Sequence, residues 1–594
     1  MGVQTKHFLN SPGSLVLESL EGLCAVNPQL SLDSANKVVH LTEQDKSKVA
    51  LICGGGSGHE PSHAGFVGQG MLTAAVCGNV FASPGPNQVR RGIELTDNDK
   101  GTLIIVKNYT GDVLNFGLAK EQYAAQHATK AEHVKFLVVG DDVAVGKTQG
   151  SIVGRRGLAG TVLVYKIAGA LAREGASLDK VYEVAEFVAN NIATVGVGLE
   201  HCHVPGTASG EGHLKNTEIE IGMGIHNEPG AQRVSPVPSL HELVAQLLDL
   251  LLSTTDSERS FLPVNGQDDE VVLLVNNLGG LSELELGGIV REVEKSLGGR
   301  SIRVQRVLAG TFMTSLNMPG FSLTLLLLPK NSSKEYSADV ILRLLDASTS
   351  APGWKWHSAS PPSTLTATQQ AKPAPPLKAG QSTTLRVADP KALTAVIERV
   401  CAALNQNEAE ITRMDTIAGD GDCGLTLQNG ANGVLQQLRD GNVSGNDVVG
   451  SLIVMSEVAA EKMGGTSGAL FSIFFSALAQ GLTTAASGSG TATAQHWAQA
   501  LSLALQKLYT YTRARPPSRT LVDPLAAFVT ALEGDASDVG SAVQKAAQAA
   551  EHTRDVEARA GRSAYVEGNL LKRERVPDPG AWGIKVILEA VAST

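Results

Sequence analysis

The chain has 594 residues, a formal net charge of −10 at pH 7 and no cluster of lysine or arginine. This acidity argues against binding to the phosphate backbone of a nucleic acid. Hydrophobic residues make up 43% and charged residues 18% of the chain, which indicates folded domains, and the length predicts three or four of them. With 63 glycines and only 4% aromatic residues, the composition favours backbone-built loops around small polar ligands.

The cysteines and the apolar segments bear on the cellular compartment. The six cysteines are scattered without a C-x-x-C pair, which favours a reducing compartment. The first ten residues contain no apolar signal core, and the longest apolar stretch, residues 468–482, is short and interrupted by Ser, Gln and Gly. We therefore expect a soluble, cytoplasmic protein that binds neither a membrane nor a nucleic acid.

The first 345 residues are predicted to form two α/β lobes. Short runs of β-branched residues and leucine end in glycine-rich or polar loops, which is typical of strands buried on both faces of a sheet. These runs lie at residues 49–53, 103–106, 136–139, 271–275 and 323–328, and a helical pattern covers 178–192. Turn residues between 192 and 210 place the boundary between lobe 1 (1–195) and lobe 2 (196–345).

The composition changes near residue 350. Residues 346–390 are rich in Pro, Ser, Thr and Ala and show no apolar period, so we predict a linker there. From residue 391 onward apolar residues recur at the helical spacing i, i+3, i+4, i+7. The first set comprises Leu393, Val396, Ile397, Val400 and Leu404. Residues 391–594 are therefore predicted to form a helical domain interrupted by glycine loops.

Two loops that follow predicted strands carry titratable side chains. The loop 54–61 has the sequence GGGSGHEP and holds His59. Glycines let backbone N–H groups approach a ligand at the carboxyl end of a strand, and a histidine there suits acid/base work. The loop 107–112, KNYTGD, adds Lys107 and Asp112. The alternatives are a tight structural turn for the first loop and a solvated ion pair for the second.

Lobe 2 contributes three further segments. Loops at residues 276–280 and 310–320 also lie at strand ends, which indicates the same architecture as in lobe 1. The glycine-rich segment 222–230 holds His226. A lone histidine is more often a hydrogen-bonded structural residue than a catalyst, so spacing alone leaves both interpretations of His226 open.

The helical half holds three aspartates within eight residues, Asp415, Asp420 and Asp422. Carboxylates this close repel one another unless a cation neutralises them, and their hard oxygen atoms suit Mg²⁺ or Ca²⁺. The loop 464–468, GGTSG, opens a predicted helix whose free N–H groups would bind an anion. Together they suggest a nucleoside triphosphate site without a P-loop. A solvated acidic turn is the alternative.

These motifs resemble the single-chain, ATP-dependent dihydroxyacetone kinases, a family that includes the animal triokinase/FMN cyclase enzymes. The segments that carry the resemblance are GGGSGHEP, KNYTGD, the GIH segment, NNLGG, GTFM, AGDGDCG, GGTSG, the run 553–562 and DPGA at 578–581. They occur in the family's order and span nearly the whole chain outside the linker. The resemblance implies two α/β lobes that bind the triose and an all-α, eight-helix barrel that holds Mg-ATP.

The resemblance also implies roles for individual residues. His226 matches the histidine that adds through a ring nitrogen to the substrate's carbonyl carbon and forms a hemiaminal. His59 and Asp112 match an acid/base pair at the hydroxyl to be phosphorylated. The substrate-binding positions match Gly56, Ser57, Gly58, His59, Lys107 and Asp112. Asp415, Asp420 and Asp422 match ligands of two Mg²⁺ ions. The nucleotide pocket matches Asp420, Gly421, Asp422, Cys423, Gly464, Gly465, Thr466, Ser467, Thr512, Thr520, Arg562, Asp578, Pro579 and Gly580.

The departures from the family's pattern concern the nucleotide pocket. Residues 517–523 have the sequence PSRTLVD, where the family usually has Gly-Asp before Arg-Thr-Met-Leu-Asp, and Val556 replaces a usual methionine. The resemblance implies a phosphotransferase that uses ATP to phosphorylate dihydroxyacetone, and also D-glyceraldehyde, as a homodimer. The alternatives are a FAD-cleaving, cyclic-FMN-forming activity at the same metal site, a fatty-acid kinase-like relative and a non-catalytic sugar sensor.

Overall fold

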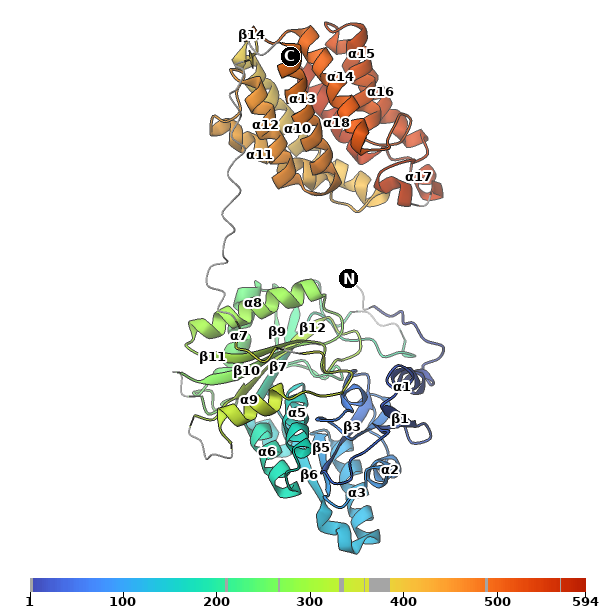
Figure 1. The fold of residues 1–594 in the computed structure, drawn as a ribbon, viewed down its shortest axis with the longest axis vertical. Coiled ribbons are helices and arrows are strands. Elements are labelled where there is room, and N and C mark those ends of the chain that lie inside the picture. The colour runs from blue at the N-terminus through green and yellow to red at the C-terminus, as the bar shows by residue number, and fades with distance from the viewer. Residues whose placement is uncertain are drawn as a thin grey trace. The chain divides into compact units, whose positions relative to one another are not determined.

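The chain divides into two compact units, Met1–Thr368 and Gln369–Thr594. A computed structural model describes residues 4–208, 212–264, 268–330, 336–356, 358–362, 385–486, 490–566 and 568–593. The first unit is α/β and the second is helical, which confirms the predicted division of fold classes (Figure 1).

The first sheet of the α/β unit has six strands in the order β1-β2-β4-β3-β5-β6. They are β1 (Leu30–Asp33), β2 (Val38–Leu41), β3 (Ala50–Ser57), β4 (Ala74–Val80), β5 (Thr102–Lys107) and β6 (Val134–Val139). The strands β3 to β6 are parallel, and β1 and β2 extend the edge in antiparallel fashion. The predicted runs at 49–53, 103–106 and 136–139 correspond to β3, β5 and β6, and the carboxyl ends of β3 and β5 carry the loops of His59 and Asp112.

The second sheet also has six strands, in the order β11-β10-β12-β7-β8-β9. They are β7 (Ile192–Gly198), β8 (Ile219–Ile221), β9 (Gln232–Val234), β10 (Glu270–Asn277), β11 (Arg303–Gly310) and β12 (Gly320–Leu327). The predicted lobe boundary at residue 195 falls inside β7, so the second lobe begins at Ile192. The glycines that suggested a turn serve strand packing instead, since a Cβ on Gly198 would lie 3.0 Å from the sulfur of Met223.

Nine helices of the α/β unit cover these sheets among the residues described. They are α1 (Leu15–Ala25), α2 (Pro86–Leu95), α3 (Thr110–Gln126), α4 (Lys147–Val153), α5 (Gly160–Arg173), α6 (Leu178–Asn190), α7 (Leu240–Leu252), α8 (Glu283–Gly299) and α9 (Ala338–Asp346). Helix α5 is almost wholly buried and contacts β3 of the first sheet and β7 and β12 of the second. One hydrophobic core therefore joins the two predicted lobes.

The predicted linker begins at residue 346, but the segment 347–356 still belongs to the α/β unit. Residues 347–356 pack onto the α/β unit, where Ala351 and Trp354 are buried and the indole N–H of Trp356 donates to the carbonyl of Val307 at 2.7 Å. The two tryptophans supply enough apolar surface to dock this proline- and serine-rich segment. Most of the remaining predicted linker, residues 363–384, lies outside the described part of the chain.

The helical unit contains eight helices longer than ten residues among those described. They are α10 (Pro390–Ala418), α11 (Cys423–Arg439), α12 (Val448–Val458), α13 (Gly465–Ala485), α14 (Ala494–Tyr511), α15 (Val522–Gly534), α16 (Val539–His552) and α18 (Pro579–Ala592). A shorter helix, α17 (Gly568–Glu574), precedes α18, and two-residue strands, β13 (Leu385–Arg386) and β14 (Gly490–Thr491), form a small parallel pair. The predicted apolar face that begins at Leu393 lies on α10.

A cavity of about 580 Å³ with an almost wholly apolar lining lies inside the helical unit. Phe471 and Phe475 of α13 are among its lining residues. By length and composition α13 is the one described helix able to cross a membrane, although only 33% of its apolar window is buried. Within the helical unit, α13 packs between α12 and α14.

Candidate active sites

His59 lies where the two sheets of the α/β unit meet. The loop after β11 pairs with the His59 loop: the N–H groups of Thr314 and Leu316 donate to the carbonyls of His59 and Gly58 at 3.2 and 2.8 Å. Nδ1 of His59 lies 2.7 Å from the carbonyl oxygen of Thr314. Because a carbonyl only accepts, Nδ1 carries the hydrogen, and Nε2 of the neutral ring is an acceptor.

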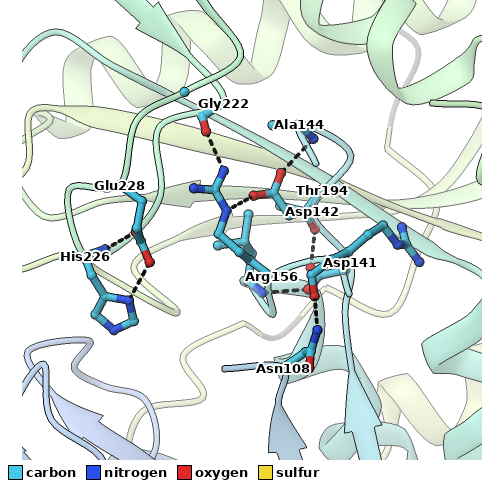
Figure 2. Close-up of polar contacts among 12 residues, drawn as sticks. Asn108, Asp141, Asp142, Ala144, Arg156, Thr194, Gly222, His226 and Glu228 are labelled. Atoms are coloured by element: carbon cyan, nitrogen blue, oxygen red, sulfur yellow. Dashed lines mark hydrogen bonds and ion pairs between the residues drawn. The ribbon is translucent and has the colours of Figure 1, made fainter. Parts of the chain in front are cut away.

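His226 contacts His59 from the second lobe. The two Nε2 atoms are 3.0 Å apart, although 167 residues separate the histidines in the sequence. On the other side of the His226 ring, Nδ1 lies 3.0 Å from Oε1 of Glu228, and Oε2 accepts the backbone N–H of His226 at 2.9 Å (Figure 2). The carboxylate therefore holds the hydrogen on Nδ1 and directs Nε2 towards His59.

Two aromatic rings enclose the His226 side chain. The rings of Phe81 and Tyr109 stand nearly perpendicular to it, with centroids 5.0 and 4.6 Å away. Phe81 also stacks on His59 and has a φ of 55°, a conformation that nothing in the sequence indicated. Glu228 was missed as well, although its position two residues after His226 could have suggested a partner for the ring.

Lys107 and Asp112 bring unsatisfied polar atoms to this site. Both side chains are buried, and neither Nζ of Lys107 nor Oδ1 of Asp112 has a hydrogen-bond partner among the described residues. Asp112 lies in the first turn of α3 beside the glycine loop, where a Cβ on Gly55 would lie 3.2 Å from Oδ2. Buried polar atoms without partners are rare in folded proteins, so these two atoms are candidates for contact with a polar ligand.

The glycine-loop residues predicted to contact substrate have packing roles in the structure. A Cβ on Gly56 would come within 2.7 Å of the amide nitrogen of Ala82, and one on Gly58 within 2.7 Å of the Phe81 ring. Glycine is therefore required at both positions. The hydroxyl of Ser57 is buried and donates to the carbonyl of Gly78 at 2.8 Å, so it joins the glycine loop to β4.

Burial and mutual charge shift the pKa values of this histidine site. Burial, with the charges of Lys107 and His226, lowers the pKa of His59 well below its usual value. Burial raises the pKa of Asp112 although Lys107 opposes the shift, and burial lowers the pKa of Lys107 although Asp112 opposes it. A neutral imidazole and a carboxylate of raised basicity are the groups that proton transfer requires.

The second candidate site lies between α10 and α11. The buried carboxylate of Asp415 accepts the N–H groups of Gly421, Asp422 and Cys423 through Oδ2 at 3.0, 2.9 and 3.0 Å. Asp420 and Asp422 are exposed, and one oxygen from each of the three aspartates lies within 4.8 Å of the others. This set of hard oxygen donors fits a divalent cation such as Mg²⁺.

Several predicted nucleotide residues gather near the aspartates. Asp578 caps α18 through the N–H of Ala581 at 2.9 Å, and burial raises its pKa to about 6. Burial first, and then the charges of Asp415, Asp578 and the other aspartates, raise the pKa of Cys423. A Cβ on Gly580 would lie 3.4 Å from Leu521, so the loop of Thr520 lies against the start of α18.

The other predicted nucleotide residues lie at helix ends. Gly464 and Gly465 have φ values of 65° and 53°, with open space around the position of a Cβ, and Thr466 and Ser467 follow in the first turn of α13. Thr512 ends α14, where its hydroxyl accepts the N–H of Ala514 at 3.1 Å, and Pro579 begins α18. Arg562 begins a 3-10 turn, but its side chain lies outside the described residues.

Comparisons with known proteins identify relatives of this chain. A model of the Dak1 domain matches residues 21–353, and a model of the DAK2 domain matches residues 417–593. The chain is 42% identical over 610 residues to a dihydroxyacetone kinase of Pichia angusta, covering 99% of this chain and 98% of the relative. The chain belongs to the dihydroxyacetone kinase family.

Two further members show the breadth of this family. The chain is 39% identical over 598 residues to the triokinase/FMN cyclase of Homo sapiens, covering 99% of each chain. The solved structure of the dihydroxyacetone kinase from C. freundii in complex with AMP-PNP and Mg²⁺ matches with a TM-score of 0.62 and 31% identity, covering 99% of each chain. The family resemblance inferred from the motifs is confirmed over both units of the chain.

Proposed function

We propose that this chain transfers a phosphoryl group from ATP to dihydroxyacetone. The triose binds at the histidine site of the α/β unit, and Mg-ATP binds at the aspartate site of the helical unit. The observation that carries the proposal is the array of His59, His226 and Glu228 beside the unpartnered polar atoms of Lys107 and Asp112. Such an array suits a small polar ligand with a carbonyl group.

The His226 ring supplies the nucleophile that tethers the substrate. The Thr314 carbonyl and Glu228 hold the Nδ1 hydrogens of the two rings, so the contact between the Nε2 atoms needs a third proton, and the histidine pair then carries one positive charge beside Glu228. When that proton passes to His59, the Nε2 lone pair of His226 is free to form a bond to the carbonyl carbon. The π electrons move to the carbonyl oxygen, which takes the proton back from His59 and becomes the hydroxyl of a hemiaminal. This gives His59 a role in addition to the acid/base role that the resemblance implies.

Asp112 and Lys107 act on the hydroxyl that accepts the phosphoryl group. The raised pKa of Asp112, caused by burial, suits a base that removes the hydroxyl proton. Asp415, Asp420 and Asp422 would hold Mg²⁺, which supplies neutralising charge to the phosphate oxygens when bound. Holding the acceptor in place removes roughly 7–11 kcal/mol of barrier that free encounter would carry, which matters for so small a substrate.

Finer features of the family stay predictions for this chain. Eight long helices around an apolar cavity support an eight-helix barrel in the helical unit. A homodimer, a second Mg²⁺ ion, D-glyceraldehyde as a second substrate and a cytoplasmic location are expected from the resemblance. A FAD-cleaving, cyclic-FMN-forming activity is the alternative suggested by the name of the human relative. A fatty-acid kinase-like protein and a sugar sensor are less well supported, because the histidine and aspartate sites are both complete.

An ATP-coupled assay of the purified chain tests the proposal. We expect Mg²⁺-dependent turnover with dihydroxyacetone and far weaker turnover with glycerol, which has no carbonyl for His226 to attack. His226→Ala should remove most of this discrimination while glycerol phosphorylation persists. Equal losses on both alcohols would argue against the tether, and no turnover on any triose would argue against the kinase. An arm with FAD and Mn²⁺ measures the alternative activity.

A further inference from the structure

Arg156 is fixed in a buried network beneath the His226 segment. Its Nε lies 2.7 Å from Oδ2 of Asp142, and its Nη2 donates to the carbonyl of Gly222 at 2.7 Å (Figure 2). The other oxygen of Asp142 accepts the N–H of Ala144 at 2.8 Å, and the Asp142 side chain is only 1% exposed. The guanidinium is therefore held from the first lobe while it supports the turn that follows β8 in the second.

The remaining nitrogen of the guanidinium, Nη1, is directed towards Glu228. A Cβ on Gly224 would lie 2.5 Å from Nη1 of Arg156 and 2.1 Å from Oε2 of Glu228. Nη1 of Arg156 and Oε2 of Glu228 therefore both border the space that a side chain at position 224 would fill. The N–H of Gly224 also donates to the backbone carbonyl of Glu228 at 2.9 Å, which closes the turn.

We propose that Arg156, anchored on Asp142 and the carbonyl of Gly222, is a positioning residue that holds the carboxylate of Glu228 against Nδ1 of His226. It acts through Glu228 and touches neither the triose nor ATP. The inference deepens the proposed function, because it assigns the support on which the nucleophilic nitrogen of His226 depends.

Glu228 balances the charge that develops on His226 during the addition step. The ring keeps its Nδ1 hydrogen while Nε2 forms the bond to carbon, so the alkylated ring carries a positive charge that the carboxylate of Glu228 stabilises at 3.0 Å. Burial alone would raise the pKa of Glu228, but its hydrogen bonds and the charge of His226 bring it to about 2. Arg156 adds a fixed cation beside this partly exposed carboxylate: it forms no hydrogen bond with Glu228 among the described residues, and its charge favours the ionised carboxylate on the side that faces Nδ1 of His226.

A purely structural role for the Arg156–Asp142 pair predicts a different result. In that case the pair only joins the two lobes, and its loss would lower the stability of the α/β unit without a selective effect on the tether. Arg306 provides the matched control, since its guanidinium forms a similarly buried pair with Asp346, with nitrogen–oxygen distances of 2.9 and 2.6 Å. Neither residue of that pair contacts the His226 segment among the described interactions.

The experiment compares Arg156→Met, Arg156→Lys and Arg306→Met in the full chain. Protein is mixed with dihydroxyacetone labelled with ¹³C at the carbonyl carbon, without ATP, and the tetrahedral hemiaminal carbon is observed by NMR. We expect Arg156→Met to weaken adduct formation at least tenfold, Arg156→Lys to restore part of it, and Arg306→Met to form the adduct like the wild type. In turnover, Arg156→Met should raise KM for dihydroxyacetone more than it lowers kcat.

Two results would overturn the inference: normal adduct formation by Arg156→Met, or equal losses in Arg156→Met and Arg306→Met. Should Arg156→Met fail to fold, Asp142→Asn replaces it, because it removes the charge that anchors Nε of Arg156 and leaves Gly224 and Glu228 unchanged. The Nδ1–H signal of His226 in ¹⁵N NMR gives a readout that needs no substrate: it should be sharp in the wild type and lost in Arg156→Met. A wild type that shows this signal but phosphorylates no triose would refute the proposed function and leave the positioning role standing.

Discussion

Replacing Asp415 by asparagine should loosen the turn that presents the other two aspartates. Oδ2 of Asp415 accepts three backbone N–H groups at 2.9–3.0 Å in a buried position. A hydrogen bond to a charged acceptor contributes roughly 1.5–3 kcal/mol and a neutral one roughly 0.5–1.5 kcal/mol. Loss of the charge therefore costs about 1 kcal/mol for each bond, and about 3 kcal/mol for the turn.

Hydrogen exchange at the amides of Gly421, Asp422 and Cys423 measures this cost directly. Since 1.4 kcal/mol corresponds to a factor of ten, these amides should exchange about 100-fold faster in Asp415→Asn than in the wild type. Asp422→Asn is the matched control, because its exposed carboxylate is proposed to bind the metal but accepts none of the three bonds. Unchanged exchange in Asp415→Asn, or equal acceleration in both variants, would refute the assignment of Asp415 as the structural centre of the turn.

Two further predictions concern stability. Because burial raises the pKa of Asp578 to about 6, the folded chain retains a proton that the unfolded chain releases near pH 4, so stability should fall as pH rises from about 4 to 6. Asp578→Asn should flatten that profile and stabilise the helical unit at pH 7 by on the order of 1–3 kcal/mol in thermal unfolding with EDTA; an unchanged profile would refute the shift. Gly54→Ala should destabilise the α/β unit by roughly 1–3 kcal/mol or more, because its Cβ would lie 2.2 Å from the carbonyl oxygen of Val76. Gly22→Ala, in open space on α1, is the control that should leave unfolding unchanged or slightly stabilise the unit.

The fold classes followed from residue periodicity, but strand direction and lobe limits did not. Continuous apolar runs indicate burial on both faces of a sheet, and the runs at 271–275 and 323–328 are indeed buried strands, yet they pair antiparallel. The glycines of β7 suggested a turn because the sequence does not reveal that the Met223 segment packs against them. The docking of residues 347–356 was missed because Pro and Ser dominate the composition there while Trp354 determines the packing.

Some residues of the candidate sites could be predicted from the sequence, and others could not. Glycine loops at strand ends indicated His59 and Asp112, and the spacing of the aspartates indicated the metal site, because both signals are local in sequence. The contact between His59 and His226 depends on packing between two sheets, so it was not predicted, although the family resemblance gave both histidines roles on one substrate. Glu228 lay within reach of sequence reasoning, whereas Phe81 and Arg156 act through contacts that no local pattern records.

The two histidines put the proposed substrate selection in the α/β unit. His59 and His226 belong to different sheets, and their contact depends on the shared core around α5 and on the backbone bonds that join the His59 loop to residues 314–316. The groups proposed to hold phosphate and metal all belong to the helical unit. The proposed discrimination for a carbonyl and the proposed neutralisation of phosphate charge therefore rest on residues of two different compact units. Changes at Arg156 or His226 should alter triose binding while nucleotide binding persists. Changes at Asp420 or Asp422 should weaken Mg-nucleotide binding while triose binding persists.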